Sequence, residues 1–243
     1  MNGVVAKLTA RLLLGNKRAV GIGLVMLVPV IIAILFRTSD EDLSTRPVDF
    51  AGDLVGSLIL AILLPLVALV MGTAAIGNEI EDGTVVFLLA KPVDRRRIVV
   101  VKAAVAAAAS AVVCVPTTVA TTWIIVGGNE GGLTVGLGLA ALVASVVYSV
   151  VFVALSTATS RALVIGLLYV FVWEAILANV FGGLAWLSVR AYSEAIADTA
   201  IDALGYQPDL STGAGVVMAL IVVAGALWVG GNKLAGFEIG ERT

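Results

Sequence analysis

The sequence predicts an all-α polytopic membrane protein with six transmembrane helices. Apolar residues make up 60% of the 243 positions and charged residues only 13%, and the mean hydropathy is +1.09. A soluble domain has roughly 45–50% apolar and about 25% charged residues. The apolar residues also form uninterrupted runs of about twenty, which is long enough to cross a hydrocarbon core about 30 Å thick. We therefore expect a single transmembrane domain over residues 1–243.

Six apolar stretches are expected to span the membrane: 19–36, 54–77, 103–126, 133–158, 162–181 and 213–232. The first follows a basic N-terminal segment, but it is too long for the core of a typical signal peptide, so we interpret it as a retained span. Pro29, Pro65 and Pro116 fall inside predicted spans. Because neighbouring helices can satisfy the freed carbonyl groups in a bilayer, we expect kinks at these prolines and not helix ends.

The basic residues predict the orientation. With both termini in the cytoplasm, twelve of the fifteen lysines and arginines lie inside and three lie outside. Short cytoplasmic loops carry an excess of Lys and Arg, so this orientation is favoured over its opposite. The inner residues are Lys7, Arg11, Lys17, Arg18, Lys91, Arg95, Arg96, Arg97, Lys102, Arg161, Lys233 and Arg242; the outer ones are Arg37, Arg46 and Arg190.

Two further segments show helical periodicity without being able to span. Residues 4–14 place apolar and basic side chains on opposite faces, which is typical of a helix lying in the interface on anionic lipid. Between the fifth and sixth spans, Val189, Tyr192 and Ile196 recur at helical spacing, with Glu194 and Asp198 on the opposite face. We expect this outer segment to rest on the outer leaflet or to cap the bundle from outside.

The sequence offers little for catalysis. It has no histidine and one cysteine, Cys114, so the usual zinc and haem sites are not expected. No G-x-x-x-x-G-K-[ST] phosphate loop is present. We expect this chain to be no enzyme and to bind no cofactor or nucleic acid. Any uphill transport must then draw energy from another subunit or from an ion gradient.

The connection between the second and third spans, Gly77 to Lys102, is more informative. Its acidic residues come first, Gly83 then permits a turn, and Thr84 is suited to cap a short helix over 85–90. Pro92 ends that helix. An apolar helix outside the membrane, bracketed by acids and bases, could dock on a partner protein. Alternatively it could lie on lipid headgroups, held by the arginines that follow.

This connection resembles the cytoplasmic loop of ABC-2 type transporter permeases, which runs Glu-x-Glu-x-Gly-Thr, Leu-Leu, Pro, Arg and then Lys. The matching residues are Glu79, Glu81, Gly83, Thr84, Leu88, Leu89, Pro92, Arg95 and Lys102. Asp94 departs from the family, which more often has serine or threonine there. In the fifth span, Tyr169, Trp173 and Glu174 are similar to the Tyr-x-x-x-Trp-Glu of many such permeases.

The resemblance implies the membrane subunit of an ATP-binding-cassette exporter with a type V-like fold, in a bacterial or archaeal inner or plasma membrane. A second copy or a related permease would complete the pathway, and two separate ATPase subunits would bind ATP and Mg²⁺. The loop helix would then be a coupling helix. Val86, Phe87 and Leu89 would dock it, Glu79 and Glu81 would pair with cations of the ATPase, and Gly83 and Pro92 would set its ends.

Glu174 is the one ionisable residue well inside a predicted span, roughly 18 Å along a helix from Ala162. An intramembrane charge is costly and often functional. It could contact substrate or a gate near the outer mouth, or it could tie the fifth span to a neighbouring element. Two alternatives to the permease stay open: a self-contained secondary transporter or channel using Glu174, and a membrane anchor or assembly factor that transports nothing. The apolar spans favour a drug-like or amphiphilic substrate.

Overall fold

The computed structural model describes residues 17–39, 47–81, 95–127, 131–177, 186–198 and 210–235, and these are nearly all helical, with no strand among them. The helices are α2 (Lys17–Thr38), α3 (Pro47–Leu54), η1 (Val55–Leu63), α4 (Leu64–Glu81), α6 (Arg95–Val126), α7 (Gly131–Ala158), α8 (Ala162–Leu168), η2 (Tyr169–Leu177), α10 (Val189–Ala197) and α11 (Thr212–Ala235). The predicted N-terminal interfacial helix and the coupling helix over 85–90 lie outside the described residues.

Five helices of the described chain are long and apolar enough to cross a membrane: Val20–Thr38, Pro47–Ile76, Arg96–Val126, Gly131–Ala158 and Thr212–Leu234. The predicted fifth span corresponds to a shorter apolar helix, Ala162–Glu174. The described residues therefore support a multi-pass membrane protein with five membrane-length helices, and the count of six spans stays a prediction.

The second and third spans are longer than the sequence indicated. The second runs without a break from Pro47 through α3, η1 and α4 to Glu81, so Glu79 and Glu81, expected just after the span, belong to its last helical turn. The third begins at Arg95, eight residues before the predicted 103. Helical hydrogen bonding therefore continues past the apolar run at the end where the basic residues gather.

Proline positions agree with continued helices. Pro29 lies inside α2 and Pro116 inside α6. Pro65 follows the π-helix η1, and Leu64 just before it donates its backbone N–H to the Ile59 carbonyl five residues back. Proline has no N–H and its ring crowds the carbonyl four residues earlier. The wider π winding ahead of Pro65 is compatible with that crowding.

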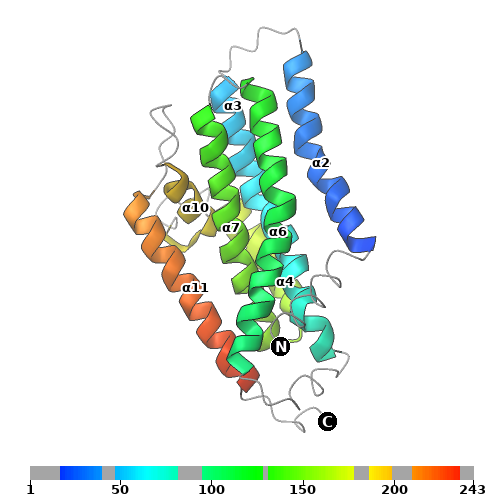
Figure 1. Cartoon of the computed structure of the whole chain (residues 1–243), viewed down its shortest axis with the longest axis vertical. Helices are drawn as coiled ribbons and strands as arrows, with labels where there is room; N and C mark the ends of the chain where they lie inside the picture. The colour runs from blue at the N-terminus through cyan, green and yellow to red at the C-terminus, as the bar shows by residue number, and fades with distance from the viewer. Residues whose placement is uncertain are drawn as a thin grey trace.

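The helices form an inner and an outer group (Figure 1). In α7 and in Pro47–Ile76, 72% and 67% of the apolar window is buried, against 17% in both α2 and α11. α6 and α7 run side by side through the centre, with α2 and α11 on opposite sides of them. In Figure 1 the start of α2 and the end of α11 are the lower ends of these helices, and the end of α11 lies further down.

Small residues bring the inner helices close together. A Cβ atom at Gly72 of α4 would lie 2.9 Å from Cβ of Phe152 in α7. Ala141, Ser145 and Ser149 are buried along one row of α7, and the Ser149 hydroxyl donates to that of Ser110 in α6 at 3.3 Å. Such contacts let van der Waals packing and interhelical hydrogen bonds hold helices together where lipid removes the hydrophobic driving force.

The C-terminal end of α2 is held by its last basic residue. Arg37 Nη1 donates to the Ile124 carbonyl oxygen of α6 at 3.0 Å. This places a cation beside the C-terminal end of α6, where the helix dipole is negative. The chain leaves α6 at Gly127, whose φ of +70° favours glycine, and Gly127 N–H donates to the Trp123 carbonyl at 2.9 Å.

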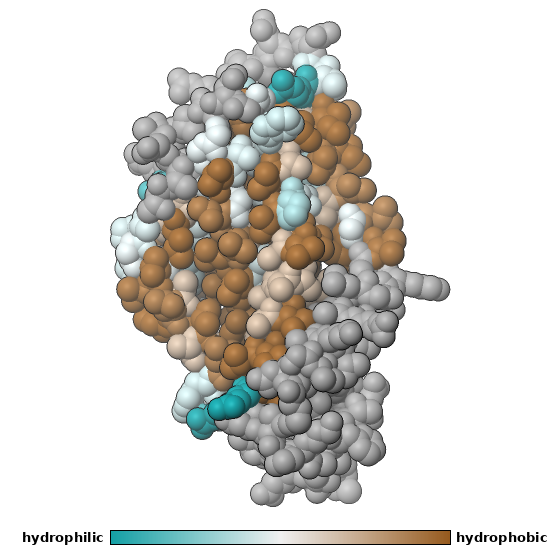
Figure 2. All heavy atoms as spheres, viewed as in Figure 1, coloured by the Kyte–Doolittle hydropathy of each residue, from teal (hydrophilic) through white to brown (hydrophobic). Residues whose placement is uncertain are grey.

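Apolar side chains also cover much of the outside (Figure 2). On the face shown, a broad hydrophobic surface separates hydrophilic residues at the upper and lower margins. The large exposed hydrophobic residues belong mainly to α2, α8, η2 and α11. A contiguous apolar surface of this extent would be a liability in water and is the expected surface toward lipid.

Candidate functional site

Glu174 lies in η2, where π winding sets its neighbours. In a π-helix the backbone bond joins residues five apart, so residues i and i+5 share a face. Tyr169 and Glu174 have this spacing, and the Tyr169 hydroxyl donates to Glu174 Oε1 at 2.9 Å. The local winding thus aligns the two ends of the Tyr-x-x-x-Trp-Glu stretch.

The Glu174 carboxylate is fully buried and accepts two more hydrogen bonds from the segment that begins α10. Oε1 accepts the Val189 backbone N–H at 2.9 Å, and Oε2 accepts the Ser188 hydroxyl at 2.7 Å. We call Tyr169, Glu174, Ser188 and Val189 the Glu174 clamp. In these three hydrogen bonds the Glu174 oxygens are the acceptors.

Ser188 has a second role as the N-cap of α10. Its backbone is extended, with φ −96° and ψ 122°, and its hydroxyl oxygen accepts the Ala191 N–H at 3.3 Å. Such caps satisfy one of the free N–H groups at a helix start. Glu174 satisfies another through Val189, and its negative charge lies where the helix dipole is positive. The carboxylate thus fixes where α10 begins.

Other side chains hold the residues just before the cap. Trp173 Nε1 donates to the Leu187 carbonyl oxygen at 3.1 Å, and the Tyr192 hydroxyl donates to the Trp186 carbonyl oxygen. Burial, and next the nearby Glu174 charge, raise the pKa of Tyr192, so its phenol stays protonated and able to donate. Two adjacent residues of η2 therefore hold the segment Trp186–Val189. Trp173 bonds to Leu187, and Glu174 bonds to Ser188 and Val189.

The outer helix α10 is buried more deeply than the sequence indicated. Both Tyr192 and Glu194, expected on opposite faces, are buried, because α10 packs against α7 and α11. The burial of Glu194 was therefore not predicted, whereas the expected place of this segment, on the outer leaflet or capping the bundle from outside, stays a prediction. Glu194 is paired instead: Arg190 Nε donates to its Oε1 at 2.8 Å. A Cβ atom at Gly56 of η1 would lie 3.2 Å from that same oxygen.

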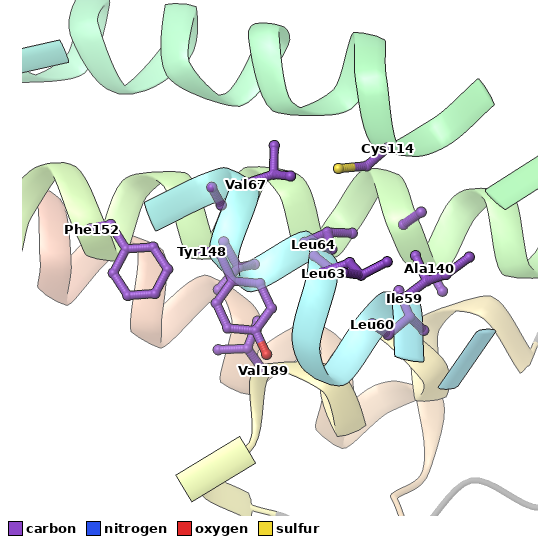
Figure 3. Packing of buried hydrophobic residues seen from close by; sticks show 14 of the residues in the cluster. Ile59, Leu60, Leu63, Leu64, Val67, Cys114, Ala140, Tyr148, Phe152 and Val189 are labelled. Atoms are coloured by element: carbon purple, nitrogen blue, oxygen red, sulfur yellow. The ribbon is translucent and has the colours of Figure 1, made fainter. Parts of the chain in front are cut away.

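Tyr148 of α7 lies beside Val189 of the Glu174 clamp (Figure 3). Its ring is fully buried, and its hydroxyl points toward Val189 (Figure 3). Within the described residues, however, no group lies in hydrogen-bonding geometry with it. Tyr148 is seventeen residues from the start of α7 and ten from its end, so α10 begins beside the middle part of α7 (Figure 3).

The predicted coupling residues are mostly not described. Glu79 and Glu81 are placed only as backbone in the last turns of α4, and Arg95 as the first residue of α6. The remaining coupling residues lie outside the described ranges: Gly83, Thr84, Val86, Phe87, Leu88, Leu89 and Pro92.

The two helices that flank this connection are tied together. Lys102 of α6 is fully buried, and its Nζ donates to the Ala75 carbonyl oxygen of α4 at 2.5 Å. Nearer the start of α6, Arg96 Nη2 donates to Asn232 Oδ1 of α11 at 2.8 Å. The first turns of α6 therefore contact both α4 and α11 at the end from which the connection departs.

Sequence reasoning singled out Glu174 but missed its partners. Ser188 carried a usable signal, since a serine directly before a helical run is a common N-cap. No signal in the sequence pointed to Tyr148, or to Lys102 as a buried donor, because both depend on which helices become neighbours. Among the described residues, no group of three or more His, Cys, Asp or Glu could hold a metal ion.

Comparison with known proteins agrees with this architecture. The family description "ABC-2 family transporter protein" matches residues 4–230. No curated protein matches the sequence. The matched range covers every described helix except the last residues of α11. The chain belongs to the ABC-2 family of transporter proteins.

Proposed function

We propose that this chain is the permease subunit of an ATP-binding-cassette exporter and that separate subunits hydrolyse ATP. The observation that carries this proposal is the family match over residues 4–230 of a chain with five membrane-length helices. The sequence contains no phosphate-binding loop, so the energy for transport must reach the chain from outside. Two ATPase subunits, each binding ATP and Mg²⁺, would supply it.

The connection 82–94 is the proposed contact with the ATPase. Motion imposed there would pass first to the end of α4 and the start of α6. The Lys102–Ala75 hydrogen bond supports this route because it joins those two helices close to the connection. The contact between Arg96 and Asn232 would extend the same motion to α11.

The proposed orientation puts this end of the bundle in the cytoplasm. Arg96, Arg97, Arg161 and Lys233 are exposed where α6, α8 and α11 begin or end at one side, whereas Asp49 lies near the other. An excess of basic residues marks the cytoplasmic side. Both termini would then be cytoplasmic, and α10 would lie in the outer half of a bacterial or archaeal plasma membrane.

A second copy of the chain, or a related permease, would form the translocation pathway with this one. The large exposed apolar residues of α2, α8 and α11 suit contact with lipid or with another apolar helix. An interior with few charged groups suits an amphiphilic or drug-like substrate. The rival reading, an ion-coupled carrier using Glu174, is disfavoured because that carboxylate is already engaged by Tyr169, Ser188 and Val189.

Reconstitution tests the proposal. The chain is co-purified with a candidate ABC ATPase, and the complex is placed in liposomes. We expect ATP-dependent movement of a fluorescent amphiphilic dye, and none with an ATPase variant that cannot hydrolyse ATP. Gly83→Val should keep the complex intact but lower the dye moved per ATP hydrolysed, with Gly131→Ala as the control. Dye movement that follows an ion gradient without any ATPase would refute the proposal in favour of a secondary transporter.

A further inference from the structure

The end of α11 is fixed against two other helices. An added Cβ atom at Gly230 would lie 3.2 Å from the Ala154 Cβ atom of α7 and 3.3 Å from the Val99 Cγ1 atom of α6. Beside this contact, Arg96 Nη2 donates to Asn232 Oδ1 at 2.8 Å. The start of α6 and the end of α11 also lie together at the lower end of the bundle in Figure 1. The two helix ends therefore form one corner of the bundle.

Two exposed cations belong to this corner. Arg97 directly follows Arg96 in α6, and Lys233 directly follows Asn232 in α11, so both lie next to residues that are in contact. Within the described residues, neither side chain has a hydrogen-bond or ion-pair partner. The carboxylates whose side chains the structure describes lie on α3, η2 and α10 or at the end of α10. The corner therefore carries positive charge that suits an anionic partner.

Exposed apolar side chains lie about one helical turn away from each cation. Trp228, 66% exposed, precedes Lys233 by five residues in α11. Val100, 48% exposed, follows Arg97 by three residues in α6. Figure 2 shows hydrophilic residues at the lower margin, directly below the hydrophobic surface. Both cations thus lie where the lipid-facing surface ends, and an exposed tryptophan is typical of that level of a membrane protein.

This combination favours one kind of partner. An acidic protein surface would bind the two cations but would not explain the exposed Trp228 and Val100 beside them. A phospholipid with a net negative charge matches both features. Its phosphate would accept charge-assisted hydrogen bonds from Arg97 and Lys233, and its acyl chains would contact Val100 and Trp228. Basic side chains between membrane helices are suited to such headgroups.

We propose that the corner between α6 and α11 binds an anionic phospholipid, whose phosphate is held by Arg97 and Lys233 and whose acyl chains contact Val100 and Trp228. We call these four residues the anionic-lipid site. Bound lipid covers the junction of the two helices that Arg96 and Asn232 join, at the end of α6 where the connection 82–94 departs. The site goes beyond the proposed permease function and requires only that the chain spans a membrane.

Tryptophan fluorescence tests the site in vesicles of phosphatidylcholine and phosphatidylglycerol, because bromine on an acyl chain quenches only a tryptophan in contact with it. Two samples of the same lipid composition are compared, one with brominated phosphatidylglycerol and one with brominated phosphatidylcholine. The ratio of quenching per brominated lipid gives the preference for the anionic lipid. The contribution of Trp228 is the difference between the unmodified chain and Trp228→Phe. Trp123, exposed near the other end of α6, is measured in the same way with Trp123→Phe.

We expect Trp228 to report a clear preference for phosphatidylglycerol and Trp123 to report little. Each cation near a membrane surface strengthens the binding of anionic lipid about fivefold. Lys233→Gln and Arg97→Gln should therefore each lower the preference at Trp228 about fivefold and leave the value at Trp123 unchanged. Lys233→Arg keeps the charge and should retain the preference.

Arg161→Gln is the matched control. Arg161 is another exposed cation at this end of the bundle, but it lies where α8 begins, and α8 packs on α4 and α7. Its replacement should leave the preference at Trp228 nearly unchanged. An equal loss in Arg161→Gln and Lys233→Gln would refute the site in favour of a diffuse attraction to the whole basic end. Equal preference at Trp228 and Trp123 in the unmodified chain would refute it as well.

The same variants are also co-purified with the candidate ABC ATPase. If Lys233→Gln weakens that complex while Trp228 shows no lipid preference, the corner binds a protein and the lipid proposal is wrong. Failure of the full complex to export dye would refute the permease proposal but not this site, since the fluorescence experiment uses the chain without the ATPase.

Discussion

The Val189 backbone N–H donates a 2.9 Å hydrogen bond to Glu174 Oε1, so a side chain of the fifth membrane helix caps a helix that starts fifteen residues later. Val189 is buried, and so is the carboxylate. Helix ends inside a membrane have no water to satisfy their N–H groups, so these groups need partners from the protein. Glu174 supplies such a partner to the first N–H group of α10.

Replacement of Glu174 should weaken the whole outer half of the bundle. Glu174→Ala leaves Tyr169, Ser188 and Val189 without their common acceptor, which should cost about 2–4 kcal/mol in a buried site. Glu174→Gln keeps one acceptor oxygen and should cost less. Thermal unfolding in detergent, followed by the loss of the monodisperse species, measures both. Equal stability of the alanine variant and the unmodified chain would show that the clamp is not a stabilising contact.

Gly127 should tolerate no β-branched residue. Its φ of +70° is costly for other residues by about 1–2 kcal/mol. In addition, a Cβ there would lie 2.7 Å from Arg37 Nη1, which caps the end of α6. Gly127→Val should therefore lower the unfolding temperature and release the outer end of α2. Gly131→Ala, at a position with no atom within 4 Å of the added Cβ, is the matched control and should unfold like the unmodified chain.

Gly72 should be equally intolerant, for a different reason. An added methyl group would lie 2.9 Å from Phe152 Cβ and 3.3 Å from the Val153 backbone nitrogen, so α4 and α7 would have to separate. Overpacking of this kind costs typically 1–3 kcal/mol, and we expect about 2 kcal/mol for Gly72→Ala. Gly23→Ala in α2, where the added Cβ meets nothing within 4 Å, should be neutral or slightly stabilising. Chemical denaturation in mixed micelles would compare the two.

Lys102 should matter for coupling more than for folding. Methionine has a similar volume but cannot donate to the Ala75 carbonyl, and replacement of buried ionic contacts by well-packed apolar groups is often neutral for stability. Lys102→Met should therefore unfold like the unmodified chain but move less dye per ATP hydrolysed. Lys102→Arg, which keeps a donor, should retain more of the coupling. A methionine variant with an unchanged ratio of dye moved to ATP hydrolysed would remove Lys102 from the coupling route.

Much of the fold could be predicted from the sequence because hydropathy directly reports burial in lipid. The long runs that became α2, α7 and α11 were predicted within about two or three residues at each end, counting from 19–36, 133–158 and 213–232. Helix ends were harder to predict where polar residues continue the helix beyond the apolar run. The turn through Glu79 and Glu81 and the start at Arg95 lie beyond the apolar runs, so hydropathy alone places the boundaries too far inward.

The site was predictable only in part, because its geometry depends on tertiary neighbours. Glu174 stood out as a charge in an apolar run. However, π winding at η2 decides that Tyr169 shares its face, and nothing in local propensity distinguishes π from α winding there. The burial of Glu194 was not predicted because α10 looks amphipathic in sequence, whereas Arg190 pairs with Glu194 within the helix. Periodicity shows a polar face but not that a partner covers it.

The burial of α10 between α7 and α11 also constrains the order in which the protein can be assembled during synthesis. α7 precedes α10 along the chain, but α11 follows it. The ribosome therefore synthesises α10 before α11, one of the two helices that bury it, has been made. A nine-residue helix is too short to be inserted as a span. The segment must therefore wait near the outer surface of the growing bundle and take its buried position only after α11 has been inserted.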